Sequence, residues 1–392
     1  MRPALGILDF KPVQYHAPLY RCLTYRQNIE LDVLFLHDIP LAGTFDPGFR
    51  VNIAWDIDLV SGYKNSFLLP GRQQVPQSPI THLLKLNTWL RRHDAIVIHG
   101  YTNPWMLLAI AWCRRSRIPY FLRGDSQPDG HAVGIRRRLR DSLVRQVVTR
   151  SAAGLAIGQL NAQFYRRYGA ARVIFAPYSV DYARFSLQPS RTRRELLLAH
   201  GLNPDLPVII YCGKLYPGKR PLDLARAVAL LPAAVNTIFV GDGILADEVR
   251  TSLKPGYGAV TGFINQSEIT SYYHAADIIV VPSMVENWGL VLNEAMASGT
   301  FPIASSNVGA TPDLVHNVGE IYQCADIAGL AAAISRGLTR IKDPSSRLLV
   351  QRRISKYGLE RTARGYEEAV LGITGHGANS DSAVSRDEAL PR

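Results

Sequence analysis

Long apolar runs are absent from this sequence of 392 residues. A helix that crosses a bilayer needs about 18 consecutive apolar residues, and no stretch approaches that length. The apolar start of the chain is interrupted by Asp9 and followed by Lys11, so it is too short for the core of a secretory signal. We therefore expect a cytoplasmic protein, either soluble or peripheral on the inner face of a membrane.

Cysteine is scarce, and its spacing excludes two kinds of site. The four cysteines are Cys22, Cys113, Cys212 and Cys324, and no Cys-x-x-Cys pair or neighbouring histidine pair accompanies them. We therefore expect neither a disulfide framework nor a zinc module. The cysteines are better explained as reduced, buried small residues.

Acidic residues are sparse in the first half only. Residues 1–190 contain 24 Lys and Arg against 12 Asp and Glu, whereas residues 191–392 contain 20 of each. Such an asymmetry indicates that the first half binds an anionic partner. The candidates are a phosphorylated or acidic acceptor, an anionic membrane surface and nucleic acid.

Apolar strands alternate with helical segments along the whole chain. The runs at 4–8 and 31–36 flank a helical pattern, and the run at 208–212 starts a second series of the same kind. This alternation predicts an α/β fold with parallel sheets. The length is ample for two or three domains, each with its own core.

The most informative stretch is residues 280–299, with the sequence VVPSMVENWGLVLNEAMASG. It predicts a strand end, a short loop and a helix from about Gly289 that stops at Gly299. Glu286 lies in the loop and Glu294 about two helical turns further on. Unpaired backbone N–H groups at the helix start suit an anionic ligand. An ordinary buried strand and amphipathic helix is the alternative interpretation.

This stretch resembles the retaining glycosyltransferases of the large "glycosyl transferases group 1" family. The shared pattern is Glu, seven residues and Glu, with Gly-Leu inside and Glu-Ala-Met-Ala-x-Gly at its end. The resemblance implies the GT-B fold, in which two Rossmann-like domains with parallel sheets face each other across a cleft. It places the domains at 1–178 and 207–354, the linker at 179–206, a crossing helix at 355–372 and a disordered tail at 373–392.

The resemblance assigns nucleotide-sugar binding to the second domain. Lys214 and Lys219 would hold the diphosphate, because a departing nucleoside diphosphate needs fixed cations where no metal is used. Glu286 would hold the sugar and Glu294 the ribose hydroxyls. The full donor set is Gly213, Lys214, Lys219, Phe263, Ile264, Glu286, Asn287, Trp288, Gly289, Leu290 and Glu294.

Polar residues after the strands of the first domain are candidates for the acceptor side. They are Gln14, His16, His99, Arg123 and Asp125. Ligands of open α/β sheets bind beyond the carboxyl ends of the strands, which is where these residues are expected. Gln14 and His16 belong to a Gln-Tyr-His-x-Pro-Leu motif that recurs in a subgroup of the family, and Asp125 is a further catalytic candidate. Structural roles for His16, Arg123 and Asp125 remain open alternatives.

Two further motifs are not expected to bind a ligand of their own. Asp56-x-Asp58 lacks the accompanying acid or histidine cluster of a metal site, so we predict no metal and no cofactor besides the donor. The Gly-x-Gly of residues 241–243 lacks the acid that would hold a dinucleotide ribose.

The long irregular segment 38–80 is expected to bind the acceptor.

Arginines cluster in the segment from Arg136 to Arg150, with apolar residues at helical spacing. Such a helix would bind an anionic membrane surface, or it is simply a solvated charged face. Nucleic acid is a weaker interpretation, since no recognisable binding motif accompanies the arginines.

The predicted function is therefore transfer of a sugar from a nucleoside-diphosphate sugar to an acceptor hydroxyl with retention of configuration. Assembly of a cell-surface polysaccharide or glycolipid is the expected setting. The alternatives are a nucleotide-sugar epimerase, a non-catalytic nucleotide-sugar binder of the same fold, and a basic adaptor for membranes or nucleic acid.

Overall fold

The computed structural model describes residues 2–71, 78–128 and 135–374. Contacts between residues divide the chain into two compact units. The first unit comprises residues 1–42, 58–178 and 359–392, and the second comprises residues 43–57 and 179–358. The predicted tail at 373–392 lies almost wholly outside the described residues.

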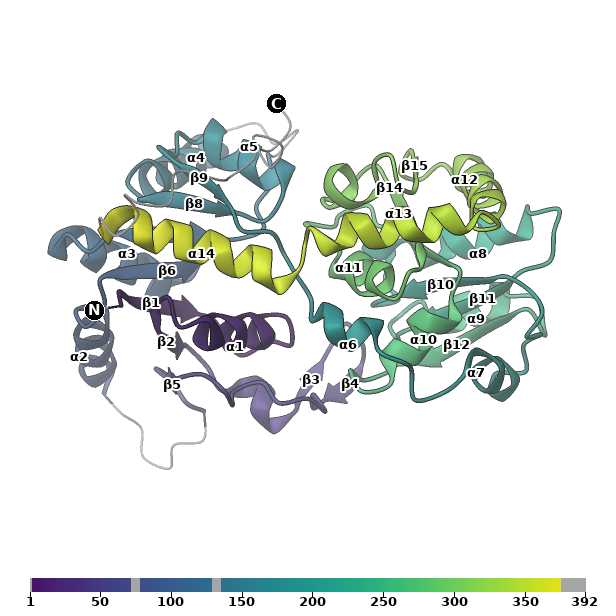
Figure 1. The fold of residues 1–392 in the computed structure, drawn as a ribbon, viewed down its shortest axis with the longest axis horizontal. Helices are drawn as coiled ribbons and strands as arrows, with labels where there is room; N and C mark the ends of the chain where they lie inside the picture. Colours follow the sequence, from purple (N-terminus) through teal and green to yellow (C-terminus); the bar gives the residue numbers. More distant parts are fainter. Residues whose placement is uncertain (1, 72–77, 129–134, 375–392) are drawn as a thin grey trace. The chain divides into compact units, whose positions relative to one another are not determined.

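The first unit is built on a parallel sheet with the strand order β5-β2-β1-β6-β7-β8-β9 (Figure 1). In its centre Leu5 of β1 lies opposite Leu31 of β2 and Ala95 of β6. The helices α2, α3, α4 and α5 share one buried apolar cluster with the sheet, while α1 and α14 pack against each other. Because both faces are covered, the central strands are apolar almost throughout.

The elements of the first unit follow the alternation that the sequence predicts. They are β1 (Ala4–Asp9), α1 (His16–Arg26), β2 (Glu30–Phe35), the 3-10 helix η1 (Ile39–Ala42), β5 (Asn65–Phe67), α2 (Pro79–Leu90), β6 (Ala95–His99), α3 (Pro104–Ser116), β7 (Tyr120–Arg123), α4 (Ile135–Thr149), β8 (Ala153–Ala156), α5 (Gln159–Arg167), β9 (Val173–Phe175) and α14 (Leu359–Thr374).

The second unit repeats the design with the parallel order β12-β11-β10-β13-β14-β15. Its elements are β3 (Thr44–Asp46), β4 (Val51–Ile53), α6 (Tyr182–Ser186), α7 (Arg193–Ala199), β10 (Val208–Cys212), the 3-10 helix η2 (Pro217–Lys219), α8 (Pro221–Ala229), β11 (Asn236–Val240), α9 (Ala246–Ser252), β12 (Gly258–Gly262), α10 (Ile269–Ala275), β13 (Ile278–Val281), α11 (Leu290–Ala297), β14 (Phe301–Ser305), the π-helix η3 (Thr311–Val315), β15 (Glu320–Tyr322), α12 (Ile327–Arg340) and α13 (Pro344–Ser355). Two Rossmann-like units with parallel sheets confirm the predicted fold class.

Both sheets have a topological switch point, where chain connections leave in opposite directions. It lies between β1 and β6 in the first unit and between β10 and β13 in the second. Ligands of such sheets bind beyond the carboxyl ends of the strands at this point. The loops after these four strands are therefore where each site is to be sought.

Two segments of the fold differ from the prediction made from the sequence. Residues 43–57 form a β3–β4 hairpin that groups with the second unit, although the sequence places them within the first. Residues 179–206, expected to be a linker, contain the helices α6 and α7. Within the described ranges, none of the helices has the length and apolar character needed to cross a bilayer.

Candidate functional site

Two loops pack against each other beside the switch point of the second unit, one after β10 and one after the neighbouring strand β11. Gly241 and Gly243 have φ angles of +142° and +151°, and each lies directly against the loop after β10. A Cβ on Gly241 would be 1.9 Å from the carbonyl oxygen of Gly213, and one on Gly243 would be 2.4 Å from that of Leu215. The Gly-x-Gly sequence therefore serves the close packing of these two loops.

The loop after β13 is fixed by its backbone to the segment after β14. The amide of Gly309 donates to the Glu286 carbonyl (2.9 Å), and that of Ala310 donates to the Trp288 carbonyl (3.0 Å). The indole of Trp288 is buried and donates to Asn293 Oδ1 (2.8 Å). Gly289, with φ +97°, turns the chain into α11. These contacts give the Glu286 side chain a defined origin at the start of α11.

The predicted donor-site lysines both carry a carboxylate partner. Lys219 forms an ion pair with Glu286, so the loops after β10 and β13 bring two predicted residues together. Lys214 pairs instead with Asp46 of the hairpin, at 2.8 and 2.9 Å to its two oxygens. Burial alone would raise the pKa of Asp46, but hydrogen bonds from Lys214 and from the amides of Phe49 and Gly48 hold it below its usual value. Asp46 is thus an anion in contact with a lysine predicted to bind phosphate.

Glu294 is more buried than Glu286 and the two predicted lysines. Its side chain on α11 is buried, and Oε2 accepts a hydrogen bond from the Tyr273 hydroxyl (2.6 Å). Cys212 lies close by, and burial raises the pKa of its thiol to about 12. The four cysteines, all within the described residues, are free.

Aromatic side chains surround the predicted nucleobase stretch after β12. The ring of Phe263 lies 5.2 Å from that of Phe49 and 6.2 Å from that of Trp55 between centroids. Both partners come from the hairpin segment, which the sequence analysis assigned to acceptor binding. Phe263 and the adjacent Ile264 are half-buried. An apolar, ring-lined surface therefore adjoins the lysine loop.

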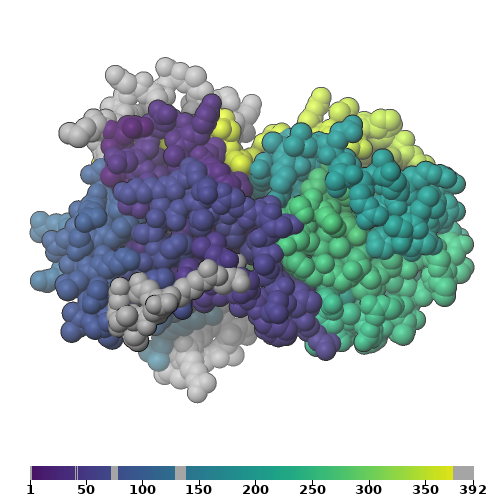
Figure 2. All heavy atoms as spheres, turned by 90° about the horizontal axis from the view of Figure 1, so that it is seen from below, coloured from purple at the N-terminus to yellow at the C-terminus, as the bar shows by residue number. Residues whose placement is uncertain are grey.

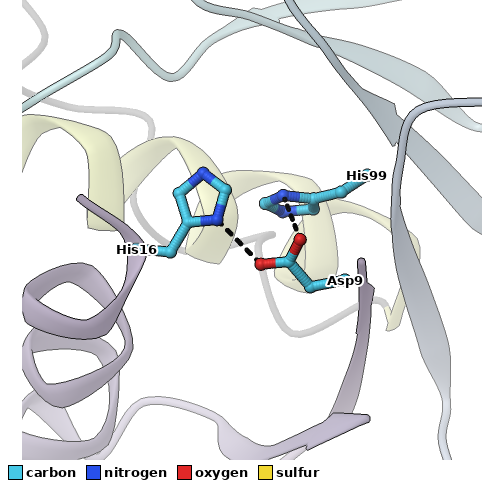
Figure 3. A group of neighbouring side chains, drawn as sticks. All are labelled: Asp9, His16 and His99. Carbon is cyan, nitrogen blue, oxygen red and sulfur yellow. Dashed lines mark hydrogen bonds and ion pairs between the residues drawn. The ribbon is translucent and has the colours of Figure 1, made fainter. Parts of the chain in front are cut away.

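The switch point of the first unit carries a compact polar cluster, shown in Figure 3. Asp9 ends β1, His16 begins α1 and His99 ends β6. Nδ1 of His16 donates to Asp9 Oδ2 (2.7 Å), and the Tyr20 hydroxyl donates to the same oxygen (2.7 Å). His99 Nδ1 lies 3.6 Å from Asp9 Oδ1, and its Nε2 lies 3.2 Å from the Tyr366 hydroxyl.

The protonation states of this cluster follow from burial and from the pairing itself. Burial alone would raise the pKa of the Asp9 carboxyl, but His16 and His99 hold it well below its usual range. Burial lowers the pKa of His99 to about 3, against the opposing charge of Asp9. Asp9 is therefore an anion and His99 a neutral imidazole at pH 7. Because a carboxylate only accepts, His16 must carry a proton on Nδ1.

The same three side chains have ligand atoms within 4.8 Å of one another, a spacing compatible with a metal ion. The Asp9 oxygens already accept hydrogen bonds from His16, from Tyr20 and from the amide of Phe10 (2.7 Å). A carboxylate whose oxygens already accept these hydrogen bonds is suited to orienting the His16 imidazole. No described residue hydrogen-bonds Nε2 of His16, which leaves that nitrogen for a ligand.

The remaining predicted residues of the first unit have different surroundings. Arg123 is buried, lies 5.2 Å from the Tyr178 ring centroid and 5.3 Å from that of Tyr366, and donates to the carbonyls of Ala176 and Pro177. These two hydrogen bonds fix the backbone that follows β9. Gln14 and Asp125 are half-buried. The structure brings His16 and His99 together, with ring centroids 4.8 Å apart.

Asp56 and Asp58 have separate hydrogen-bond partners. Asp56 accepts hydrogen bonds from the backbone amide and hydroxyl of Ser267. Asp58 accepts from the amides of Val60 and Ser61 (both 3.0 Å). Asp56 therefore ties the hairpin to the segment before α10, and Asp58 stabilises its own turn.

Asp9 was missed as a site residue by sequence reasoning. In the sequence, Asp9 is distinguished only as the residue that interrupts the first apolar run. The available signal was its place as the last residue of the first strand, a position that faces ligands in this kind of sheet.

Comparison with known proteins finds a family match within the second unit. Residues 206–340 match the model of the family "Glycosyl transferases group 1". The D-inositol 3-phosphate glycosyltransferase 2 of Catenulispora acidiphila is 35% identical over 167 residues, which are 38% of this chain and 38% of that protein. Glycogen synthase of Mycobacterium tuberculosis is 28% identical over 261 residues, 63% of this chain and 57% of that protein. The matches thus span less than two thirds of these relatives' length.

Solved structures match along nearly the whole chain. Sucrose-phosphate synthase of Thermosynechococcus elongatus has a TM-score of 0.70 and 18% identity, covering 96% of this chain and 100% of that one. Anabaena HepE in complex with UDP and glucose has a TM-score of 0.69 and 16% identity, covering 95% and 100%. The chain therefore has the fold of these proteins.

Proposed function

Because residues 206–340 belong to the glycosyl transferases group 1 family, we propose that the protein is a retaining, metal-independent glycosyltransferase that uses a nucleoside-diphosphate sugar. The single observation that carries this is the meeting of Lys219 and Glu286 at the switch point of the second unit. A cation for the diphosphate and a carboxylate for the sugar hydroxyls thereby adjoin each other on separate loops.

The donor's parts are assigned to the second unit. Lys214 and Lys219 bind the diphosphate, and Glu286 with the backbone of residues 287–290 binds the sugar. Glu294 accepts hydrogen bonds from the ribose hydroxyls, its carboxylate being oriented by Tyr273. As the glycosidic bond breaks, negative charge grows on the diphosphate, and the ammonium groups bound to it stabilise that charge.

The acceptor's hydroxyl is assigned to the polar cluster of the first unit. His16 presents Nε2 as the site for that hydroxyl, and Asp9 fixes the imidazole orientation through Nδ1. No enzymatic nucleophile is assigned, because positioning and charge stabilisation account for the rate. The proton of the acceptor passes to the leaving phosphate on the same face of the sugar.

The identity of the substrates is proposed from charge and from the relatives' names. HepE is described in complex with UDP-glucose, so UDP-sugars are the first donors to test. The excess of Lys and Arg in residues 1–190 favours a phosphorylated or acidic acceptor. The name of the inositol-phosphate relative makes an inositol phosphate a first acceptor to try.

We also propose that α4 attaches the protein to an anionic membrane surface from the cytoplasm. Leu139 and Leu143 are exposed at 68% and 46%, one helical turn apart, while Val144, Val147 and Val148 form the buried face. The Arg138, Arg140 and Arg145 side chains flank this apolar pair. Basic residues around exposed apolar ones are the pattern of interfacial helices.

The function is tested by a ligand screen followed by a donor assay. A nucleoside diphosphate at 100 times its dissociation constant stabilises a protein by about 2.7 kcal/mol, so UDP, ADP and GDP are compared by thermal shift. The sugar form of the stabilising nucleotide is then incubated with and without acceptor. A transferase forms a glycoside of unchanged anomeric configuration only with acceptor. Conversion of the donor alone would instead indicate an epimerase, and binding without either reaction would indicate a nucleotide-sugar binder.

A further inference from the structure

The β3–β4 hairpin, residues 43–57, belongs by sequence to the first unit and by contact to the second. Its antiparallel strands pair Thr44 with Ile53 and Asp46 with Val51. Figure 2 shows the purple atoms of this hairpin against the green atoms of the second unit. Both ends of the hairpin continue directly into the first unit.

The hairpin's turn aims a carboxylate at Lys214. Asp46 Oδ1 accepts hydrogen bonds from the amides of Gly48 (2.8 Å) and Phe49 (3.1 Å) within its own turn. Those two bonds fix the carboxylate, which then accepts from the Lys214 ammonium through both oxygens. A Cβ on Gly48 would lie 2.5 Å from Lys214 Cδ, so a larger residue there would have to push the lysine side chain aside.

The rest of the hairpin is held against the loops that follow β12. Asn265 Nδ2 donates to the Ala54 carbonyl (2.7 Å), and the Ser267 amide donates to Asp56 (3.2 Å). The Phe49 ring lies between the lysine and the nucleobase stretch, 5.2 Å from Lys214 Nζ and 5.2 Å from the Phe263 centroid. The hairpin therefore contacts both places where the donor is proposed to bind.

We propose that Asp46 is an internal counter-ion of Lys214 that the diphosphate of the donor replaces. The inference rests on the proposed function, because it takes Lys214 as a diphosphate ligand. A carboxylate and a phosphate oxygen compete for one ammonium, and both cannot hold it in the same geometry. The diphosphate carries more negative charge than the carboxylate, and the ion pair is partly exposed, so its replacement is feasible.

The sign of the effect separates this role from a structural one. A residue that merely supports the lysine loop lowers the affinity for nucleotide when it is changed. A competing anion raises the affinity when it is neutralised. Asp46→Asn suits the test because an Asn oxygen still accepts the turn's two amide bonds while the charge is lost.

The experiment measures the dissociation constants of UDP and of inorganic pyrophosphate by titration calorimetry. The proteins are the full-length wild type, Asp46→Asn and Asp247→Asn, whose carboxylate on α9 is exposed and pairs with Arg250. The control changes the net charge equally. We expect Asp46→Asn to bind both ligands about fivefold more tightly, since neutralising a partly exposed pair removes a small competing interaction. We expect the control to bind as the wild type does.

Equal or weaker binding by Asp46→Asn, with binding by the wild type, overturns the inference and leaves the proposed function standing. Tightening by both variants alike would also overturn it, because net charge would then be the cause. If UDP and pyrophosphate bind to none of the proteins, and the thermal-shift screen finds no binding of ADP or GDP, the proposed function fails and the inference fails with it. Adding Lys214→Ala to Asp46→Asn should abolish the gain in affinity.

Discussion

Nδ1 of His16 and Oδ2 of Asp9 are 2.7 Å apart, and this bond ties the first turn of α1 to the end of β1. His99 faces the other oxygen of the same carboxylate from β6. The switch point of the first unit is thus held by one buried anion and two imidazoles.

We predict that protein stability falls as the pH is lowered below about 6.5, in part because of His99. Its pKa is lowered from 6.5 to about 3, so between these values the unfolded chain binds a proton that the folded chain does not. Stability then rises with pH across this window and is lost toward pH 3, with a slope of up to ~1.4 kcal/mol per pH unit.

The measurement compares urea unfolding of wild type and His99→Asn at pH 7, 6 and 5. Other histidines with lowered pKa values, His200 and His274, remain in both proteins, so the difference isolates His99. The variant should lose less stability than the wild type on acidification. Parallel losses in the two proteins would show that His99 takes up its proton without penalty.

Replacement of Lys219 or Glu286 should lower turnover while leaving the fold intact. Each side chain is about one-fifth exposed, so the space left by truncation stays open to water. The loss of a cation at the leaving diphosphate, or of the sugar's carboxylate ligand, costs on the order of 10²-fold in turnover. Lys219→Ala and Glu286→Ala are assayed with the donor found by the thermal-shift screen, with circular dichroism as the check on folding.

Arg336 and Glu320 offer a matched control, since they form an ion pair elsewhere on the second unit. Arg336→Ala should retain wild-type turnover. Near wild-type turnover of both Lys219→Ala and Glu286→Ala would refute their assignment to the donor site.

Gly241→Ala should weaken nucleotide binding strongly by forcing the loops after β10 and β11 apart. Its Cβ would lie 1.9 Å from a backbone oxygen, which cannot move as a side chain can. Gly256→Ala separates this clash from backbone strain, because Gly256 also has a positive φ (+77°) but no atom within 4 Å of the added Cβ. The readout is the dissociation constant of UDP. Equal effects of the two variants would mean that strain, and not loop contact, is responsible.

The sequence predicted the parts of this fold whose signals are local. Apolar runs located the central strands, and the Glu286 to Gly299 pattern predicted the loop and helix α11 with a left-handed Gly299 at its end (φ +86°). The hairpin was not predicted, because its strands are three residues long and half of their residues are exposed. Its partner Asn265 lies 211 residues from Ala54 in sequence, and no local pattern encodes such a contact.

The partners of charged residues were equally hidden. The spacing of Lys214 and Lys219 indicates a phosphate loop, but nothing in it indicates that Asp46 meets the first lysine and Glu286 the second. Arg123 illustrates the converse case. Its place after a strand suggested a ligand contact, whereas burial between two tyrosine rings directs its guanidinium to backbone carbonyls.

Substitution of aspartate for the exposed leucines of α4 should detach the protein from anionic vesicles. Leu139→Asp and Leu143→Asp each remove apolar surface available for insertion and add a charge repelled by the lipid headgroups. Binding is measured by co-sedimentation with vesicles of phosphatidylcholine containing phosphatidylserine, at low and at physiological salt.

Ser142→Asp is the matched control, because this exposed residue of the same helix gains the same charge without loss of apolar area. A greater loss for the leucine variants than for the control indicates insertion of the helix, whereas equal losses indicate attraction by charge alone. Wild-type protein that stays in the supernatant at low salt would refute the membrane assignment, and α4 would then be a solvated face.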